Sequence, residues 1–245
     1  MVGVVTALVV HSAPLSQRNR QGQGPRKERR NMAFAKKEKV AITPPNIVTA
    51  RFRIIGTAPL VQNKFSARVL EGLAAKQMAG SAGAKRTKKE PKDFDQCCKE
   101  ATHVSDDGWY GLPASAFRRG LISTCRLLGF PMTLAKLSIF VEADGYETDR
   151  FGTNPLVKIT KGEPRRTDFA VRNETGVADI RPRPMWEPGW EAIVSISYDA
   201  DQFTQSDVAN LLARMGMQVG IGAGRHDSSD STGMGWGTFR IAGGE

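Results

Sequence analysis

Five runs of β-forming residues follow one another between residues 137 and 199. In chain order they are "LSIFVEADG", "LVKITKG", "RRTDFAVRN", "VADIRPRPMW" and "EAIVSISYD". Strands that are joined by short connections pair antiparallel, because a parallel connection needs a crossover of a dozen or more residues. These runs therefore exclude an all-helical fold and a wholly parallel sheet, and they predict an antiparallel sheet.

Two amphipathic helices flank this β-rich stretch, and a further helix is predicted from Ser66. The first flanking helix, "PASAFRRGLISTCRLLG", has Pro113 in its first turn and Gly129 at its exit. Its apolar side chains recur at three- and four-residue steps and form one buried stripe. The stripe consists of Phe117, Leu121, Cys125 and Leu128.

The second flanking helix, "TQSDVANLLARMG", has capping-box spacing between Thr204 and Asp207 and is predicted to end at Gly216. Strands are also predicted at residues 47–56, where apolar and polar side chains alternate, and at residues 238–241. This order of elements favours an α+β fold, with helices on one face of an antiparallel sheet. A ferredoxin-like or RRM-like (RNA-recognition-like) core with an inserted β-hairpin fits it.

The chain divides into a basic arm and one folded domain. Residues 1–46 are poor in apolar side chains after their first ten positions, so we expect a disordered N-terminal arm. We interpret the first residues of the arm as an unstructured leader, or as the result of a start site assigned too far upstream. In either case the protein proper is expected to begin near Met32. Residues 47–245 form the α+β domain, with a flexible basic loop over residues 80–95 and the inserted hairpin over residues 163–186.

The formal net charge of +10 favours a polyanionic partner, most often nucleic acid. Three cysteines, two of them adjacent at Cys97 and Cys98, build no disulfide framework and show no metal-ligand spacing. We therefore expect a reducing, cytoplasmic setting, with no cofactor and no metal. The apolar start of the chain is too short for a membrane span, so no membrane partner is expected.

Three places hold candidate nucleic-acid contacts. One is the start of the first flanking helix, because free N–H groups at a helix N-terminus bind phosphate. Another is the predicted hairpin, where arginines interleave with Phe169 and Trp186 and can contact phosphates while the rings stack on bases. The third is the glycine-rich segment, residues 217–241, whose glycines permit close approach of the main chain to a strand. The candidate residues are Ser115, Arg118, Arg119, Arg126, Arg166, Arg172, Arg181, Arg183, Gly222, Gly224, Arg225 and His226.

Each of these places also has a purely structural interpretation. The helix arginines can form a solvated face, and the hairpin arginines can decorate an exposed ribbon. The glycines can provide a tight connection from the second flanking helix to the last strand. Both interpretations are consistent with the sequence.

No catalytic constellation is predicted. In "GIGAGRHD" a helix precedes the glycines and a strand follows them, which is the reverse of a phosphate-binding loop. His226 and Asp227 are adjacent and form an acid/base pair of a kind that is common by chance. No carboxylate cluster for divalent metals stands out. The sequence therefore predicts a binding protein and not an enzyme.

Three segments, in order, resemble the repeat-associated mysterious protein (RAMP) superfamily, the RNA-binding subunits of CRISPR effector complexes. They are "RFRIIGTAPLVQNKFS", "YGLPASAFRRGLISTCR" and "GIGAGRHDSSDSTGMGWGTFRI". The filament-forming backbone subunit is the nearest type, and phage-encoded proteins share the layout. In the second segment Pro113, Ser115 and Gly120 match the family's helix entry, and Arg119 replaces its usual lysine. The third segment carries an acidic, serine-rich insert, "DSSDST".

The resemblance implies non-catalytic binding of single-stranded nucleic acid, with RNA favoured over DNA. It also implies a homo-oligomer that repeats along a nucleoprotein filament, in the cytoplasm of a bacterial cell or of a phage-infected bacterial cell. The helix entry and the glycine-rich segment would touch the strand, and the hairpin would reach a neighbouring subunit. Two alternatives stay open: a phage structural or assembly protein without enzymatic activity, and an endoribonuclease of the same superfamily that uses His226.

Overall fold

The computed structural model of the chain describes residues 42–80, 91–172, 176–228 and 233–243. The chain divides into two units, Met1–Thr43 and Pro44–Glu245, and the fold below is that of the second unit. Most of the predicted arm and most of the predicted basic loop lie outside the described residues.

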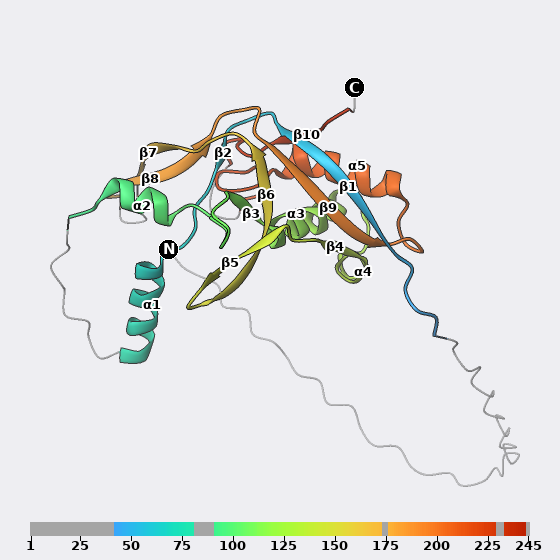
Figure 1. Cartoon of the computed structure of the whole chain (residues 1–245), viewed down its shortest axis with the longest axis horizontal. Helices are drawn as coiled ribbons and strands as arrows, with labels where there is room; N and C mark the ends of the chain where they lie inside the picture. The colour runs from blue at the N-terminus through green and yellow to red at the C-terminus, as the bar shows by residue number, and fades with distance from the viewer. Residues whose placement is uncertain (1–41, 81–90, 173–175, 229–232, 244–245) are drawn as a thin grey trace, which may run out of the picture. The chain divides into compact units, whose positions relative to one another are not determined.

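A seven-stranded sheet is the centre of the fold (Figure 1). Its main path runs in the order β10-β1-β9-β6-β3, while β4 pairs with β9 and β5 pairs with β6. All of these pairs are antiparallel. The strands are β1 (Ile47–Gly56), β3 (Gly111–Pro113), β4 (Ile139–Val141), β5 (Gly145–Asp149), β6 (Gly152–Lys161), β9 (Glu191–Asp199) and β10 (Phe239–Ile241).

Strand β1 follows the predicted alternation closely. Ala50, Phe52 and Ile54 are buried in the core, while Arg51 and Arg53 between them are exposed. The strand pairs with β9 along nearly its whole length, so the buried side chains of both strands fall on one face of the sheet. That face is the floor on which the helices pack.

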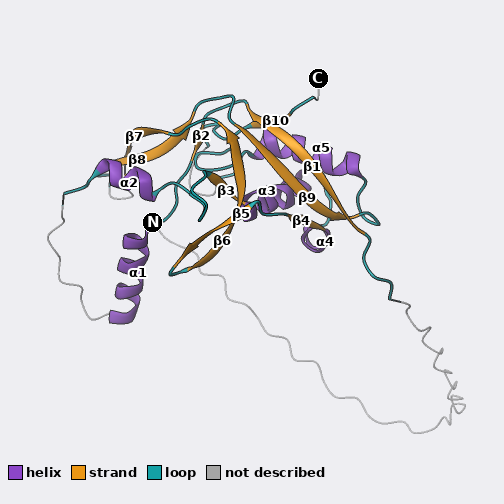
Figure 2. Cartoon of the chain, viewed as in Figure 1, coloured by secondary structure: helices purple, strands orange, loops and turns teal. Residues whose placement is uncertain are grey.

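Helices α3 (Ala114–Leu127) and α5 (Gln205–Arg214) cover the buried face of the sheet, and Figure 2 shows them beside β1 and β9. Phe117 and Leu121 of α3 share one core cluster with Leu212 of α5 and with the buried residues of β1 and β9. Leu128, predicted on the α3 stripe, is exposed because the helix has already ended at Leu127. The antiparallel sheet and five described helices confirm the predicted α+β class.

The end of α5 differs from the prediction. Its capping box is present: the Thr204 hydroxyl accepts from the Asp207 amide at 3.2 Å, and the Asp207 carboxylate accepts from the Thr204 amide at 2.9 Å. Gly216, however, does not end the helix, because a π-helical turn, η1 (Met215–Val219), continues to Gly220. A Cβ at Gly216 would lie 2.2 Å from the carbonyl oxygen of Phe239, so this glycine serves close packing against β10.

A second, three-stranded sheet has the order β2-β8-β7 and contains the predicted hairpin. Strand β7 (Arg165–Arg172) pairs with β8 (Ala178–Trp186), and β2 (Leu60–Val61) joins β8 at Trp186 and Met185. The sequence predicts the connection between these two strands at "NETG", residues 173–176, of which 173–175 lie outside the described residues. This sheet stands beside the main one and supplies one wall of the site described below (Figure 1).

Three more helices complete the described fold. Helix α1 (Ala67–Ala79) begins as predicted at Ser66, whose hydroxyl accepts from the Val69 amide at 3.3 Å. Helices α2 (Phe94–Glu100) and α4 (Met132–Ser138) were not predicted, and α2 begins inside the predicted basic loop. No helix in the described part of the chain combines the length and hydropathy needed to cross a membrane.

Candidate nucleic-acid interface

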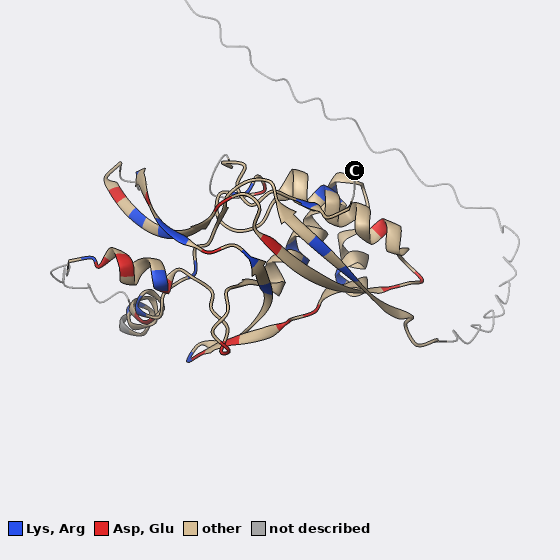
Figure 3. Ribbon diagram, turned by 45° about the horizontal axis from the view of Figure 1, so that its top comes forward, with Lys and Arg blue, Asp and Glu red and all other residues tan. Residues whose placement is uncertain are grey.

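Basic residues are spread over several elements and are not confined to one face. Figure 3 shows lysines and arginines on the hairpin strands, on α2 and on β1. Many of them pair with nearby acids; Arg166 pairs with Asp95 at 2.6 Å and with Asp168 at 3.2 Å. The net charge alone therefore does not locate an anion site, and a concave surface is needed.

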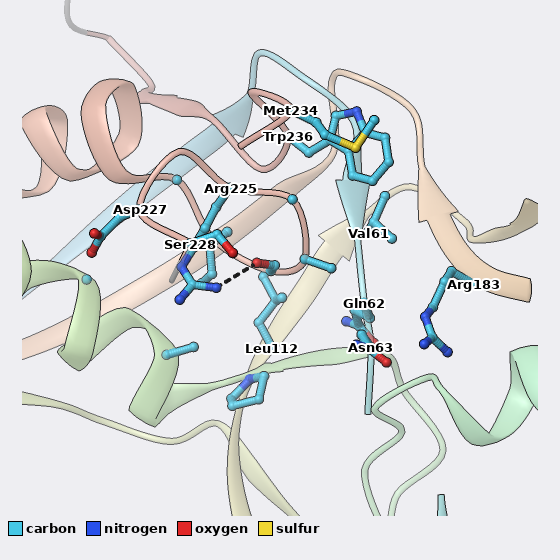
Figure 4. A pocket seen from close by; sticks show the side chains of 18 of the residues that line it. Val61, Gln62, Asn63, Leu112, Arg183, Arg225, Asp227, Ser228, Met234 and Trp236 are labelled. Atoms are coloured by element: carbon cyan, nitrogen blue, oxygen red, sulfur yellow. Dashed lines mark hydrogen bonds between the residues drawn. The ribbon is translucent and has the colours of Figure 1, made fainter. Parts of the chain in front are cut away.

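A cleft of about 620 Å³ lies where the glycine-rich segment, β2, the start of α3 and the hairpin meet (Figure 4). Its lining includes Val61 of β2, Leu112 of β3 and Trp236 of the glycine-rich segment. These residues come from both ends of the folded domain. The cleft therefore depends on the tertiary fold and on no single element.

Four of the predicted arginines line this cleft together. Arg119 comes from α3, Arg181 and Arg183 come from β8, and Arg225 comes from the glycine-rich segment. The Nη1 atom of Arg225 donates to the Gly222 carbonyl at 3.1 Å, which holds the guanidinium at the cleft wall (Figure 4). The fold thus gathers cations from three segments that lie far apart in the sequence.

The arginine pair on the hairpin carries an electrostatic cost. Burial lowers the pKa of Arg183, and the neighbouring charge of Arg181 lowers it further. An arginine stays protonated in spite of such a shift. Arg181 also has an acidic neighbour, because its Nε atom lies 3.6 Å from the Asp179 carboxylate. The hairpin thus brings two guanidinium groups to the cleft, and Asp179 partly neutralises one of them.

Two aromatic side chains stand beside these arginines. The rings of Phe169 on β7 and Trp236 have centroids 4.9 Å apart and planes tilted by 46°, and both residues line the cleft. Trp186, which the sequence placed on the ribbon as a stacking residue, is completely buried in the core. That expectation is wrong, because β8 turns the Trp186 ring toward the core, where it contacts Tyr110 edge-on. Trp236, and not Trp186, lines the cleft. Its position between two glycines is the sequence feature that could have identified it.

The glycines of this region pack the protein against itself. Gly222 and Gly224 both line the cleft and both have positive φ, at +81° and +72°. A Cβ at Gly222 would lie 2.5 Å from the Val61 carbonyl oxygen, and a Cβ at Gly224 would lie 2.4 Å from Cε3 of Trp236. The structural interpretation therefore accounts for both glycines. Because they have no side chains, the loop can pack closely against Val61 and Trp236.

Several predicted site residues lie outside the cleft lining. Arg118 donates to the carbonyls of Ile139, at 3.0 Å, and of Lys136, and its guanidinium lies 5.3 Å from the centre of the Phe140 ring. It ties α3 to α4 and β4. Arg172 donates to the Gly176 carbonyl at 3.3 Å. Arg166, as described, pairs with acids.

The remaining predicted residues lie near the cleft without lining it. Ser115 is exposed in the first turn of α3. Arg126 donates to the Ser123 hydroxyl at 3.2 Å, and that hydroxyl donates to the Asp227 carboxylate at 2.5 Å. This chain of hydrogen bonds ties α3 to the glycine-rich segment. His226 packs near Gly235, where a Cβ would lie 3.5 Å from Cε1 of its ring.

A buried polar cluster at the edge of the cleft escaped the sequence reasoning. The Glu147 carboxylate on β5 accepts from Lys64 at 2.7 Å, from the Val104 amide at 3.2 Å, and pairs with Nδ1 of His103 at 2.8 Å. Burial alone would raise the pKa of Glu147, but hydrogen bonds from His103 and Lys64 outweigh it and lower the pKa to about 2. The ionised carboxylate fixes His103, which lines the cleft. Among the described residues, no group of histidine, cysteine and acidic side chains is arranged to hold a metal ion.

Comparison with known proteins adds no assignment to this geometry. No protein-family model matches the sequence, and a search of curated proteins gives no match.

Proposed function

We propose that the cleft binds single-stranded nucleic acid. The observation that carries the proposal is the meeting of Arg119, Arg181, Arg183 and Arg225 in one cleft with the Phe169 and Trp236 rings. Proteins that bind single strands combine a basic groove for the backbone with aromatic side chains on which bases stack. The cleft offers both arginines and aromatic rings.

The chain order of the main elements supports the finer proposal of a ferredoxin-like core. The order β1, α3, β6, β9, α5, β10 is a βαββαβ arrangement, and the sheet order β10-β1-β9-β6 places the first and third of its strands at the centre. The segments that resemble the RAMP superfamily include three of these elements, β1, α3 and β10. We therefore propose RNA as the favoured strand and a repeating homo-oligomer along it as the assembly.

Fluorescence anisotropy with labelled, unstructured RNA and DNA tests the binding proposal. We expect Arg119→Gln and Arg225→Gln each to weaken binding about fivefold or more and to reduce the slope of log affinity against log salt by about 0.7. Arg214→Gln is the matched control, because Arg214 is exposed on α5, outside the cleft lining, and its loss changes the net charge equally. Thermal melts establish that each variant is folded.

Two results would contradict the proposal. One is wild-type protein that binds no oligonucleotide at low salt. The other is an equal loss for Arg119→Gln and Arg214→Gln, which would mean that binding follows net charge and not the cleft. RNA preference has its own readout: equal affinity for RNA and DNA of the same base sequence would remove that part of the proposal alone.

A further inference from the structure

A second hollow of about 370 Å³ adjoins the cleft. Asn63 and His103 line both, so the two spaces meet at these residues. The walls of the second hollow come from the residues before α1, from Leu70 in α1, from His103 and from the hairpin of β5 and β6. A strand that leaves the cleft past Asn63 therefore enters this hollow.

Two exposed phenyl rings line the second hollow. Phe65 is 64% exposed and Phe151 is 45% exposed, although large apolar side chains are usually covered. The Arg150 guanidinium lies 4.7 Å from the centre of the Phe151 ring, and Arg150 pairs with Glu71 of α1 at 2.7 Å. One face of the Phe151 ring is thus supported by a cation.

The charged groups of the hollow already have partners within the protein. Glu147 is held by Lys64 and His103, and the Asp149 carboxylate accepts from the Phe151 amide at 2.8 Å. The neutral polar groups of the lining are the amides of Asn63 and Asn154 and the hydroxyl of Thr153. Aromatic rings with amide groups suit a flat, uncharged ligand that presents hydrogen-bonding edges. Phosphate suits the arginine-lined cleft instead.

We propose that the second hollow is a nucleobase subsite, in which unpaired bases stack on Phe65 and Phe151 while the phosphates of the same strand lie in the cleft. This inference rests on the proposed function, because it uses the strand that the cleft binds. It adds a second place for bases beyond the cleft. On one side of Asn63 the strand meets the arginines and the two rings of the cleft, and on the other side its bases meet Phe65 and Phe151.

The test is an anisotropy series with oligonucleotides of about six and about fifteen nucleotides. The shorter strand is chosen to fill the cleft alone, and the longer one to fill the cleft and the second hollow. We expect the wild-type protein to gain about tenfold or more in affinity on the longer strand, and Phe65→Ala and Phe151→Ala each to remove most of that gain. Their salt slopes should equal that of the wild type, because stacking releases no counterions. Tyr146→Ala is the matched control, since Tyr146 is an exposed ring on β5 outside both linings.

A second measurement leaves the protein unchanged. Abasic nucleotides placed in the distal half of the longer strand should lower wild-type affinity by the same factor as the double variant Phe65→Ala/Phe151→Ala, and should not lower the affinity of that variant further. Wild-type protein that binds both lengths equally, or phenylalanine variants that keep the full gain, would overturn the subsite and leave the cleft proposal intact. Wild-type protein that binds neither the short nor the long oligonucleotide would instead overturn the proposed function itself.

Discussion

At the scale of single residues, Glu147 is the side chain whose burial has the clearest energetic consequence. It is buried and its carboxylate is held by Lys64, His103 and the Val104 amide. Removing its charge leaves Lys64 and His103 without their anion. We expect Glu147→Gln to lower the free energy of unfolding by roughly 2–3 kcal/mol at neutral pH, as measured by urea titration. Asp144→Asn, an exposed change on a neighbouring turn, should cost much less.

The stabilising effect of Glu147 has a defined pH window. Its pKa is lowered in the folded protein from 4.5 to about 2, so the unfolded chain takes up a proton first as pH falls. The contribution is full above pH 4.5 and is lost progressively as the pH falls toward 2. The difference in unfolding free energy between wild type and Glu147→Gln should therefore shrink across this window. A difference that stays constant to pH 2 would show that the charge is not its source.

Gly237 carries the sharpest steric constraint of the glycine-rich segment. Its φ is +68°, and a Cβ there would lie 1.7 Å from the Ile221 carbonyl oxygen. We expect Gly237→Ala to cost more than about 3 kcal/mol, because both the backbone conformation and the close contact are lost. Gly189→Ala is the control: its φ is +94° but a Cβ meets nothing within 4 Å, so only about 1 kcal/mol is expected. Similar melting temperatures for the two variants would contradict the steric account.

Only some of the arginines that the sequence predicts as site residues line the cleft. Arg119 and Arg225 were predicted as site residues and do line one cleft. Arg118 was predicted on the same grounds, yet it binds the carbonyls of Lys136 and Ile139. The partner of a cation is set by tertiary contacts, which composition and spacing do not encode.

At the scale of elements, the capping box of α5 offers a direct test of local sequence signals. Thr204→Ala removes the hydroxyl that accepts from the Asp207 amide. We expect a loss of about 1 kcal/mol in unfolding free energy, whereas Thr204→Ser, which keeps the hydroxyl, should lose little. Thermal or urea unfolding checks both. Equal losses for Ala and Ser would assign the effect to the methyl group of Thr204 and not to the cap.

Long periodic elements were predictable; of the short ones, β10 was predicted, but α4 and β5 were not. The alternation in β1 and the helical stripes of α3 and α5 extend over ten or more residues, enough to separate period 2 from period 3.6. Helix α4 has seven residues, and its last two, Leu137 and Ser138, were read as the start of a strand. Strand β5 has five residues and a Thr, Glu and Asp among them, which hides it from an apolar pattern.

At the scale of the whole molecule, ligand binding should connect segments that are distant in the sequence. The cleft lining includes residues 61–63, 169–171 and 219–225. We expect an added oligonucleotide to slow amide hydrogen exchange in all three segments together, as measured by mass spectrometry, because one ligand contacts them all. The open face of β1 around Arg51 serves as the internal control. Protection limited to one segment would contradict a shared cleft.

The sheet order could be expected only as a class. Five consecutive β-runs predicted antiparallel pairing, and the β7–β8, β6–β9 and β4–β9 pairs among them are antiparallel. The pairing of β1 with β9 joins residues more than a hundred positions apart, and nothing local in either strand specifies the other. The cleft depends on such pairings. Its arginines and glycines could therefore be predicted from the sequence, but the cleft itself could not.

The pairing of β10 with β1 has a consequence for how the protein is made. Strand β10 holds Phe239 in the core and begins three residues after Trp236, so Trp236 is the last residue of the cleft lining to be translated. A chain still growing on the ribosome can fold its early strands but has no completed groove. Under the proposed function, such a chain lacks the Trp236 ring on which bases would stack.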